Sequence, residues 1–147
     1  HSTKKNMNKI KKKVFIPMSA DFLHHGHINI LLQAKKYGKV IVGLMTDKGI
    51  ESYKKIKPLV KYKDRKKILE QIKLIDKIIP IGGLLYSKFA LKYKFDYFIH
   101  GDDWKSGPQA KERKKLIKVM KKWNGLVIET KYTKGISSSM IKKKLVF

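Results

Sequence analysis

Short apolar segments alternate with segments of helical pattern along almost the whole of this chain. The apolar segments are residues 14–18, 40–45, 75–81, 97–100 and 126–130. The helical segments are residues 28–37, 64–73, 84–92, 109–122 and 137–145. Each apolar segment is short and apolar on both faces, which is typical of parallel strands covered by helices. Because successive parallel strands need right-handed crossovers, the pattern predicts a doubly wound α/β sheet with helices on both faces.

The size of the chain suits one such domain. With 147 residues, of which 42% are hydrophobic, it can bury a substantial core. We expect residues 1–11 to form a basic tail and residues 12–147 to form the domain. The polar, lysine-rich residues 49–62 are predicted to form a mobile loop, and residues 142–144 an exposed basic end.

The composition disfavours several classes of protein. No apolar run reaches the roughly 18 residues that span a bilayer, and no signal-peptide pattern is present. The chain has no cysteine, which excludes a disulfide framework and makes the cytoplasm the expected location.

The net charge of +25 arises from 36 lysines and arginines against 11 acidic residues, and only Arg65 and Arg113 are arginine. Proteins that read nucleic-acid bases rely on arginine, so nucleic-acid binding is disfavoured. We interpret the charge as lysine enrichment that helps to steer anionic substrates. A surface for nucleic acid or for an anionic membrane is the alternative.

The segment from Ser19 to His27 joins the first apolar segment to the first helical one. Amide groups and the dipole at the start of a helix favour an anion, and Gly26 allows a phosphate to approach the backbone closely. His24 and His27, three residues apart, can direct two imidazoles at the same phosphate oxygens. The alternative is that they are helix caps or packing residues. A metal site is disfavoured, since neither cysteine nor a His-Glu-x-x-His pattern accompanies them.

A second candidate site, Gly101-Asp102-Asp103-Trp104, follows the fourth apolar segment. Its two carboxylates are placed to contact a ribose, a base or a magnesium ion, and Trp104 could cover a ligand. The same residues could equally form a turn that caps the next helix, with Trp104 packed beneath it.

A third candidate, from Thr133 to Ser139, follows the last apolar segment and precedes the last helix. Its hydroxyl and amide groups suit a second anion site, although Ser137 alone would make an ordinary helix cap. A fourth candidate is cationic. Arg65 lies at a predicted helix start, and Lys54 and Lys55 lie in the loop before it, where they could stabilise the charge of a transferring phosphoryl group.

Together these motifs resemble the cytidylyltransferases of the HxGH nucleotidyltransferase superfamily, such as the glycerol-3-phosphate and phosphocholine enzymes. The segment from His24 to His27 matches HxGH, and Asp21 precedes it as in the family. Arg65 lies at the family's arginine-bearing helix start, residues 101–104 match the glycerol-3-phosphate branch, and residues 133–139 match the signature Arg-Thr-Glu-Gly-Ile-Ser-Thr-Ser/Thr. The resemblance spans residues 12–145 and implies a Rossmann-like fold.

The reaction that this resemblance implies is transfer of CMP from CTP to a phosphorylated or phosphonylated acceptor, with release of pyrophosphate. The acceptor oxyanion would attack the α-phosphorus in line, and Mg²⁺ would accompany the triphosphate. Glycerol 3-phosphate, phosphocholine, phosphoethanolamine and small phosphonates all remain open as acceptors. The family also implies a homodimer, and a chain that starts without Met suits fusion to, or association with, another biosynthetic domain.

Two sets of residues are implied. The catalytic set is His24, His27, Lys54 and Arg65. The set that binds CTP is Ser19, Ala20, Asp21, His24, Gly26, His27, Arg65, Gly101, Asp102, Asp103, Trp104, Thr133, Gly135, Ile136, Ser137 and Ser138. No residue is predicted to hold a metal ion by itself.

The chain departs from the family signature at Tyr132, which replaces arginine, and at Lys134, which replaces glutamate. Residues 18–21, 101–107 and 132–138 most resemble the cytidylyltransferase domains associated with phosphoenolpyruvate mutase, which activate phosphonates. Three alternatives follow: an adenylyltransferase of the same superfamily, a basic nucleic-acid-binding module, and a degenerate regulatory nucleotide-binding domain.

Overall fold

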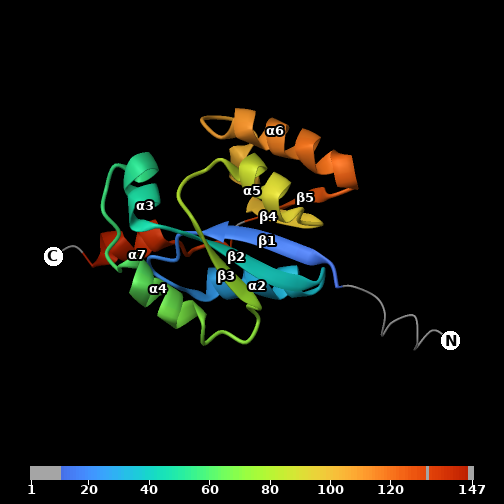
Figure 1. Cartoon of the computed structure of the whole chain (residues 1–147). Coiled ribbons are helices and arrows are strands. Elements are labelled where there is room, and N and C mark those ends of the chain that lie inside the picture. Colours follow the sequence, from blue (N-terminus) through green and yellow to red (C-terminus); the bar gives the residue numbers. More distant parts are fainter. Residues whose placement is uncertain (1–10, 132, 146–147) are drawn as a thin grey trace.

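Five parallel strands form one sheet in the order β3-β2-β1-β4-β5 in the computed structural model, which describes residues 11–131 and 133–145 (Figure 1). The strands are β1 (Lys13–Met18), β2 (Lys39–Met45), β3 (Lys77–Ile81), β4 (Tyr97–Gly101) and β5 (Leu126–Thr130). The helices are α2 (His25–Lys35), α3 (Asp47–Lys54), α4 (Tyr62–Leu69), α5 (Tyr86–Tyr93), α6 (Ala110–Met120) and α7 (Ser138–Lys144). Two short 3₁₀ turns are η1 (Asp102–Trp104) and η2 (Lys121–Trp123).

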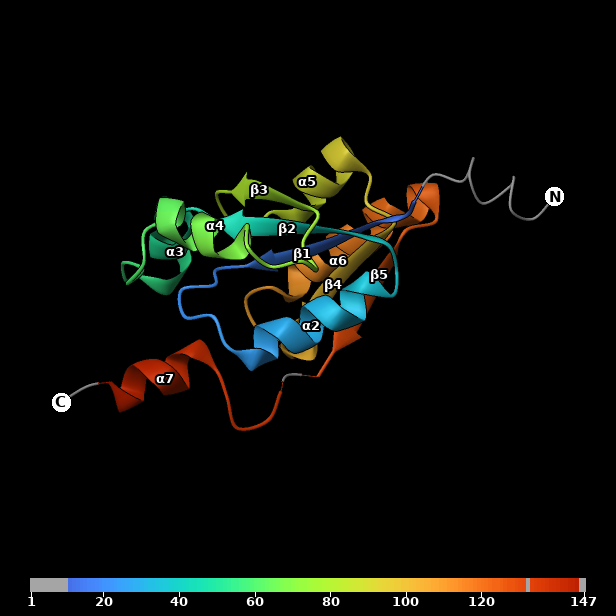
Figure 2. The ribbon, with the colours of Figure 1, turned by 90° about the horizontal axis from the view of Figure 1, so that it is seen from below.

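The sheet is covered on both faces, which confirms the predicted doubly wound α/β architecture (Figures 1 and 2). Successive residues of β1 point to opposite faces, so Val14 and Ile16 enter one buried cluster while Phe15 enters the other. The first cluster also holds Leu31 of α2 and Leu69 of α4. Burial on both faces explains why the inner strands β1, β2 and β4 are largely apolar, whereas the edge strand β5 has no buried residue and carries Glu129.

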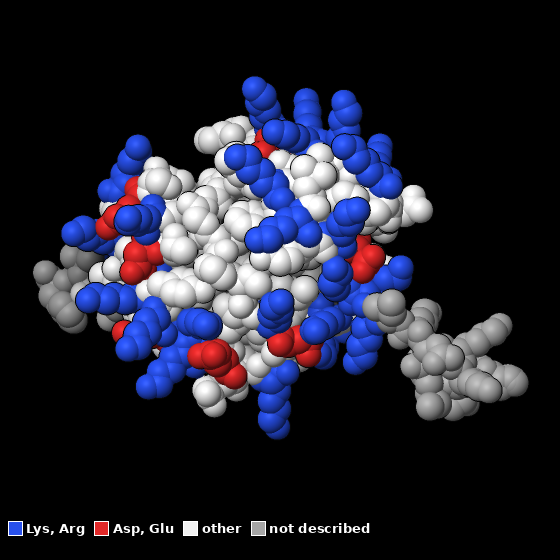
Figure 3. All heavy atoms as spheres, in the orientation of Figure 1, with Lys and Arg blue, Asp and Glu red and all other residues white. Residues whose placement is uncertain are grey.

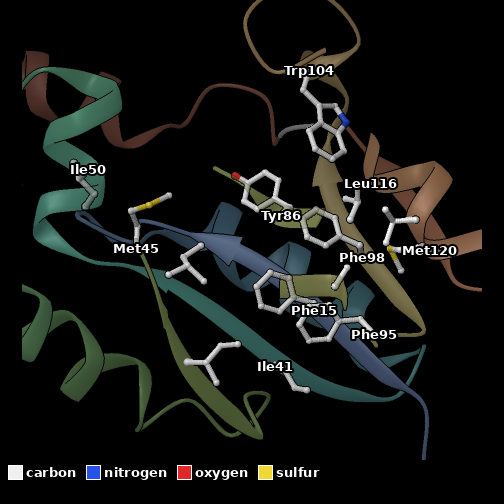
Figure 4. Packing of buried hydrophobic residues seen from close by; sticks show 14 residues of the cluster. Phe15, Ile41, Met45, Ile50, Tyr86, Phe95, Phe98, Trp104, Leu116 and Met120 are labelled. Atoms are coloured by element: carbon white, nitrogen blue, oxygen red, sulfur yellow. The ribbon is translucent and has the colours of Figure 1, made fainter. Parts of the chain in front are cut away.

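Aromatic rings fill the layer between the sheet and helices α5 and α6 (Figure 4). The Phe15 ring stacks on that of Phe95 with 4.2 Å between centroids, and Phe98 packs beside it. Trp104, from η1, and Tyr86, from α5, close this cluster at the carboxyl end of β4. The core therefore reaches the edge of the sheet at which ligands bind in folds of this kind.

The order in which strands are added to the sheet reverses between β1 and β4, although all the strands are parallel. The strands from β1 to β3 proceed outward on one side, and the chain then returns to place β4 against the other side of β1. The register pairs Val14 with Tyr97 across this junction. A crevice outside the carboxyl ends of two such strands is the expected ligand position in an open α/β sheet.

The predicted loop over residues 49–62 is wrong for its first part, because α3 (Asp47–Lys54) is a helix. Thr46 caps it by accepting a hydrogen bond from the Gly49 amide at 3.1 Å, and Ile50 is buried against the core. Gly49 allows α3 to approach residue 82, since a Cβ there would lie 3.0 Å from the Gly82 carbonyl. Packing, rather than helix propensity, holds this helix. Residues 1–10 of the predicted basic tail lie outside the described residues.

Basic side chains are spread around the face seen in Figure 3 rather than gathered in one stripe. They surround a central area without charged residues, and groups of them stand over α6. On this face the distribution agrees with general lysine enrichment.

Candidate active site

A cavity of about 680 Å³ opens at the carboxyl ends of β1, β4 and β5. Three segments supply most of its wall: the β1–α2 connection with the first turns of α2, the end of β4, and residues 130–140. A volume of this size suits a ligand as large as a nucleotide. The cavity lies at the place that the reversal of strand order predicts.

The two histidines that flank Gly26 are held by the start of α2. The Gly26 amide donates to His24 Nδ1 at 3.0 Å, and the His24 amide donates to His27 Nδ1 at 3.1 Å. Both Nδ1 atoms are therefore acceptors, so the neutral form of each ring carries its proton on Nε2. The ring centroids lie 4.1 Å apart, and both rings line the cavity. This pair can present two N–H donors to one anion.

The surroundings keep these imidazoles neutral. Burial, followed by the charge of His24, lowers the pKa of His27 to about 4. Burial, followed by His25, also lowers the pKa of His24. Neutral rings bring hydrogen-bond donors to the site without adding net positive charge.

Gly26 is required by the position of His24. A Cβ at residue 26 would lie 2.8 Å from His24 Cε1, which is closer than real Cβ contacts. Any larger residue would push the imidazole away, so the glycine of the motif makes room for its own histidine.

Two predicted residues enter the cavity near α3. Ser19 follows β1, and Lys54 is the last residue of α3. Burial, followed by Lys142, lowers the pKa of Lys54, while the carboxylate of Asp21 acts in the opposite direction. Lys54 is therefore a cation close to the cavity and to two other charged groups.

Gly101 at the end of β4 and Asp103 in η1 line the cavity, while Asp102 and Trp104 lie outside its lining. Trp104 is only 2% exposed and stacks on His100 with 3.8 Å between ring centroids. Trp104 therefore packs beneath the loop, and His100, which stacks on it, lines the cavity in its place.

Trp104 is fixed by a network that the sequence analysis did not identify. Its Nε1 donates to Glu129 Oε2 at 2.7 Å, and the same carboxylate pairs with Arg113 at 2.7 Å. The sequence gives no local signal for this pair, because Glu129 on β5 lies 16 residues away from Arg113. The network makes the wall of the cavity at His100 rigid.

Residues 133–140 form the remaining wall. The lining residues among them are Thr133, Gly135, Ile136, Ser137, Ser139 and Met140. Ser137 caps α7 by accepting a hydrogen bond from the Met140 amide at 3.1 Å, which is the ordinary helix cap given above as the alternative to an anion site. Tyr132 lies outside the described residues, as does the side chain of Ser138.

The predicted cation Arg65 is placed behind the cavity wall. It is 1% exposed, and its Nη1 donates to the carbonyls of Ser19 and Met45, each at 2.7 Å. Its Nη2 pairs with Asp47 at 2.7 Å. These bonds join the ends of β1 and β2 to α4, so the arginine positions the site rather than lining it.

Ala20 and Asp21 are likewise buried outside the lining. Ala20 adopts a left-handed φ of 50°. Asp21 accepts hydrogen bonds from the amides of Leu59 and Val60 and pairs with Lys142 at 2.6 Å. The prediction that residues 142–144 are merely an exposed end is therefore wrong for Lys142.

Within the part of the chain that the structure describes, no group of three or more His, Cys, Asp or Glu side chains is arranged to hold a metal ion. Among the same residues, none of the helices combines the length and apolar character needed to cross a membrane.

Comparison with known proteins agrees with this geometry. The model of the cytidylyltransferase-like family matches residues 16–144. The chain is 32% identical over 136 residues to glycerol-3-phosphate cytidylyltransferase from Staphylococcus aureus, covering 91% of this chain and 95% of that enzyme. It is 25% identical over 139 residues to the probable ethanolamine-phosphate cytidylyltransferase from Schizosaccharomyces pombe, covering 93% of this chain but only 37% of that protein's length.

A solved structure shares the fold. The lipopolysaccharide core biosynthesis protein from Thermoplasma volcanium superposes with a TM-score of 0.70 at 22% identity, covering 84% of this chain and 99% of that one. The Rossmann-like architecture and the resemblance to cytidylyltransferases are both confirmed.

Proposed function

This chain belongs to the cytidylyltransferase-like family, and we propose that it transfers CMP from CTP to a small acceptor that carries a phosphate or phosphonate group. At the level of the family the enzyme is a nucleotidyltransferase with CTP as its substrate. The observation that carries the proposal is the pair of neutral imidazoles at the start of α2, whose Nε2–H groups serve one large cavity.

The proposed reaction is a single in-line displacement. An acceptor oxygen forms a bond to the α-phosphorus of CTP, the bond from that phosphorus to the bridging oxygen breaks, and pyrophosphate leaves with the bonding electrons. The oxyanion needs no proton removed, so positioning and charge stabilisation supply the catalysis.

His24 and His27 donate from Nε2 to the phosphate oxygens that gain charge in the transition state. Lys54, which lines the same cavity from the end of α3, supplies positive charge to the phosphates. Arg65 acts indirectly, because its bonds to Ser19 and Met45 hold the strand ends in place. Mg²⁺ enters with the triphosphate, whose oxygens are the hard ligands it prefers.

We propose the acceptor class from the substrates named for the relatives and from the motifs that resemble those of phosphonate-activating domains. Glycerol 3-phosphate and ethanolamine phosphate each present a dianionic head on a short tail. Small phosphonates present the same head, so all three belong in the test. The homodimer, a further biosynthetic domain and a cytoplasmic location remain predictions.

The test is release of pyrophosphate with Mg²⁺, crossing CTP, ATP, GTP and UTP against glycerol 3-phosphate, phosphoethanolamine, phosphocholine and 2-aminoethylphosphonate. Turnover confined to CTP and one acceptor class is expected. Replacement of His24 by alanine should lower kcat by about 10²–10³, the effect of losing one transition-state donor. His25→Ala is the matched control, since His25 is exposed and outside the lining. Turnover with ATP in place of CTP, or equal activity in both variants, would contradict the proposal.

A further inference from the structure

The wall formed by residues 133–145 differs from the rest of the cavity in how it is attached. Neither buried apolar cluster contains a residue of this segment whose side chain the structure describes. Met140 and Leu145 are 47% and 49% exposed. In Figure 2, α7 and the loop before it run along the outer edge of the molecule, beyond α2. Ile136 and Ile141 are half-buried but belong to neither cluster, so apolar burial contributes less here than in the core, and polar contacts matter more for the position of the segment.

Among the residues that the structure describes, two such contacts join the segment to α2 and to the connection between β1 and α2. Asn29 Nδ2, on α2, donates to Thr133 Oγ1 at 3.0 Å in an exposed position. Near the other end, Lys142 Nζ lies 2.6 Å from Asp21 Oδ2, and the Asp21 side chain is 1% exposed. An exposed neutral hydrogen bond contributes little, whereas breaking a buried ion pair leaves an uncompensated charge. The contact at Lys142 is therefore the stronger attachment.

Asp21 is also held by two backbone amides, in addition to Lys142. Its two carboxylate oxygens accept the amides of Leu59 at 3.0 Å and Val60 at 2.8 Å, both in the connection between α3 and α4. Burial alone would raise the pKa of Asp21, but the hydrogen bonds from Lys142 and these two amides outweigh it and lower the pKa. Asp21 is thus an ionised carboxylate held from two sides, by the connection between α3 and α4 and by Lys142 of α7.

We propose that Lys142 is a positioning residue for the nucleotide: its ion pair with Asp21 holds residues 133–140 in place as one wall of the CTP cavity. The CTP part of this inference rests on the proposed function, whereas the placement of the wall does not. The same carboxylate lies near Lys54 at the end of α3, so one buried charge joins the HxGH connection, α3 and the C-terminal wall.

The position of α7 can be measured without any substrate. The chain has no cysteine, so Leu32→Cys on α2 and Leu145→Cys after α7 accept a unique pair of spin labels at exposed positions. Double electron–electron resonance should give one narrow distance distribution in this background. Lys142→Met should broaden it, Lys142→Arg should restore it, and Lys143→Met, the matched control on an exposed neighbour, should leave it unchanged.

Kinetics test the consequence for the nucleotide. Lys142→Met should raise KM for CTP about tenfold or more with a smaller effect on kcat, because the groups that act at the α-phosphorus remain. Asp21→Asn should give the same change, and the double variant should add little to either single one. A thermal melt of each variant shows whether it is folded.

A distance distribution in folded Lys142→Met as narrow as in the parent would overturn the inference, as would an equal rise in KM for Lys143→Met. If the parent turns over no CTP while the distances respond as expected, the proposed function fails and the positioning role of Lys142 stands.

Discussion

The half-buried imidazole of His27 should make the stability of the fold depend on pH between about 6.5 and 4. Its pKa is lowered from 6.5 to about 4, mainly by burial. A group whose pKa is depressed in the folded state takes up its proton first in the unfolded chain as the pH falls. A histidine of this kind therefore contributes stability that is fully present above pH 6.5 and is lost on acidification towards pH 4. The difference of about 2.5 between the two pKa values corresponds to about 3 kcal/mol.

The perturbation that isolates this effect is His27→Asn. The asparagine oxygen can accept the His24 amide that His27 Nδ1 accepts at 3.1 Å, and asparagine does not titrate. Urea unfolding of both proteins at pH 7.5, 6.5, 5.5 and 4.5 would measure the free energy of unfolding. We expect the parent to lose about 2–3 kcal/mol more than the variant over this range, which approaches the full linkage value.

Other groups titrate over the same pH range. The quantity to compare is therefore the loss of unfolding free energy in the parent minus the loss in His27→Asn. Burial also lowers the pKa of His24 and His100, and both rings are present in parent and variant. Equal losses of stability in the two proteins would refute the reasoning, because His27 would then titrate in the folded chain near its ordinary value. The conclusion that the surroundings of His27 hold its pKa down would then be wrong, although the hydrogen bond at Nδ1 would still place the proton of the neutral ring on Nε2.

Two further predictions concern the walls of the cavity. Gly26→Ala should lower kcat by about tenfold or more while the protein stays folded, because its Cβ would lie 2.8 Å from His24 Cε1 and displace the imidazole. Steady-state kinetics and a thermal melt would measure the two effects, and an unchanged kcat would contradict the crowding argument. Glu129→Gln should lower the free energy of unfolding by about 1–3 kcal/mol, because it removes the 2.7 Å ion pair with Arg113 while leaving an acceptor for Trp104. Urea unfolding would measure this change, and a loss below about 0.5 kcal/mol would show that the network contributes little.

The strands were predictable because their signal is local. The inner strands β1, β2 and β4 are runs of mostly buried apolar residues, and the edge strands β3 and β5 are short apolar runs that are less buried. Such runs are visible in the sequence without knowing the neighbouring strands. Helix α3 was missed for the opposite reason. Its sequence is polar and contains Gly49, and it is held by the Thr46 cap and by the burial of Ile50. Such evidence exists only once the surrounding elements are in place.

The geometry of the histidine pair was also within reach of the sequence. Both rings bond to amides within three residues along the chain, so the start of a helix after a strand is enough to orient them. The positions of the charged residues were not. Arg65 was predicted to face the substrate, yet its partners Ser19 and Met45 lie 46 and 20 residues away.

The sequence by itself determined the alternation of strands and helices, the edge of the sheet at which the motifs meet, and the family to which the chain belongs. The first two follow from periodicity and from contacts between near neighbours in the chain, and the family follows from the likeness of the motifs to those of known enzymes. Only the tertiary structure decided which charges face the cavity and which lie behind it. Asp21 and Arg65 carry charges that burial would penalise unless other elements supplied partners, and Lys142 and Asp47 supply them. The sequence contains all four residues, but the distances between them are set by the packing of the sheet and its helices.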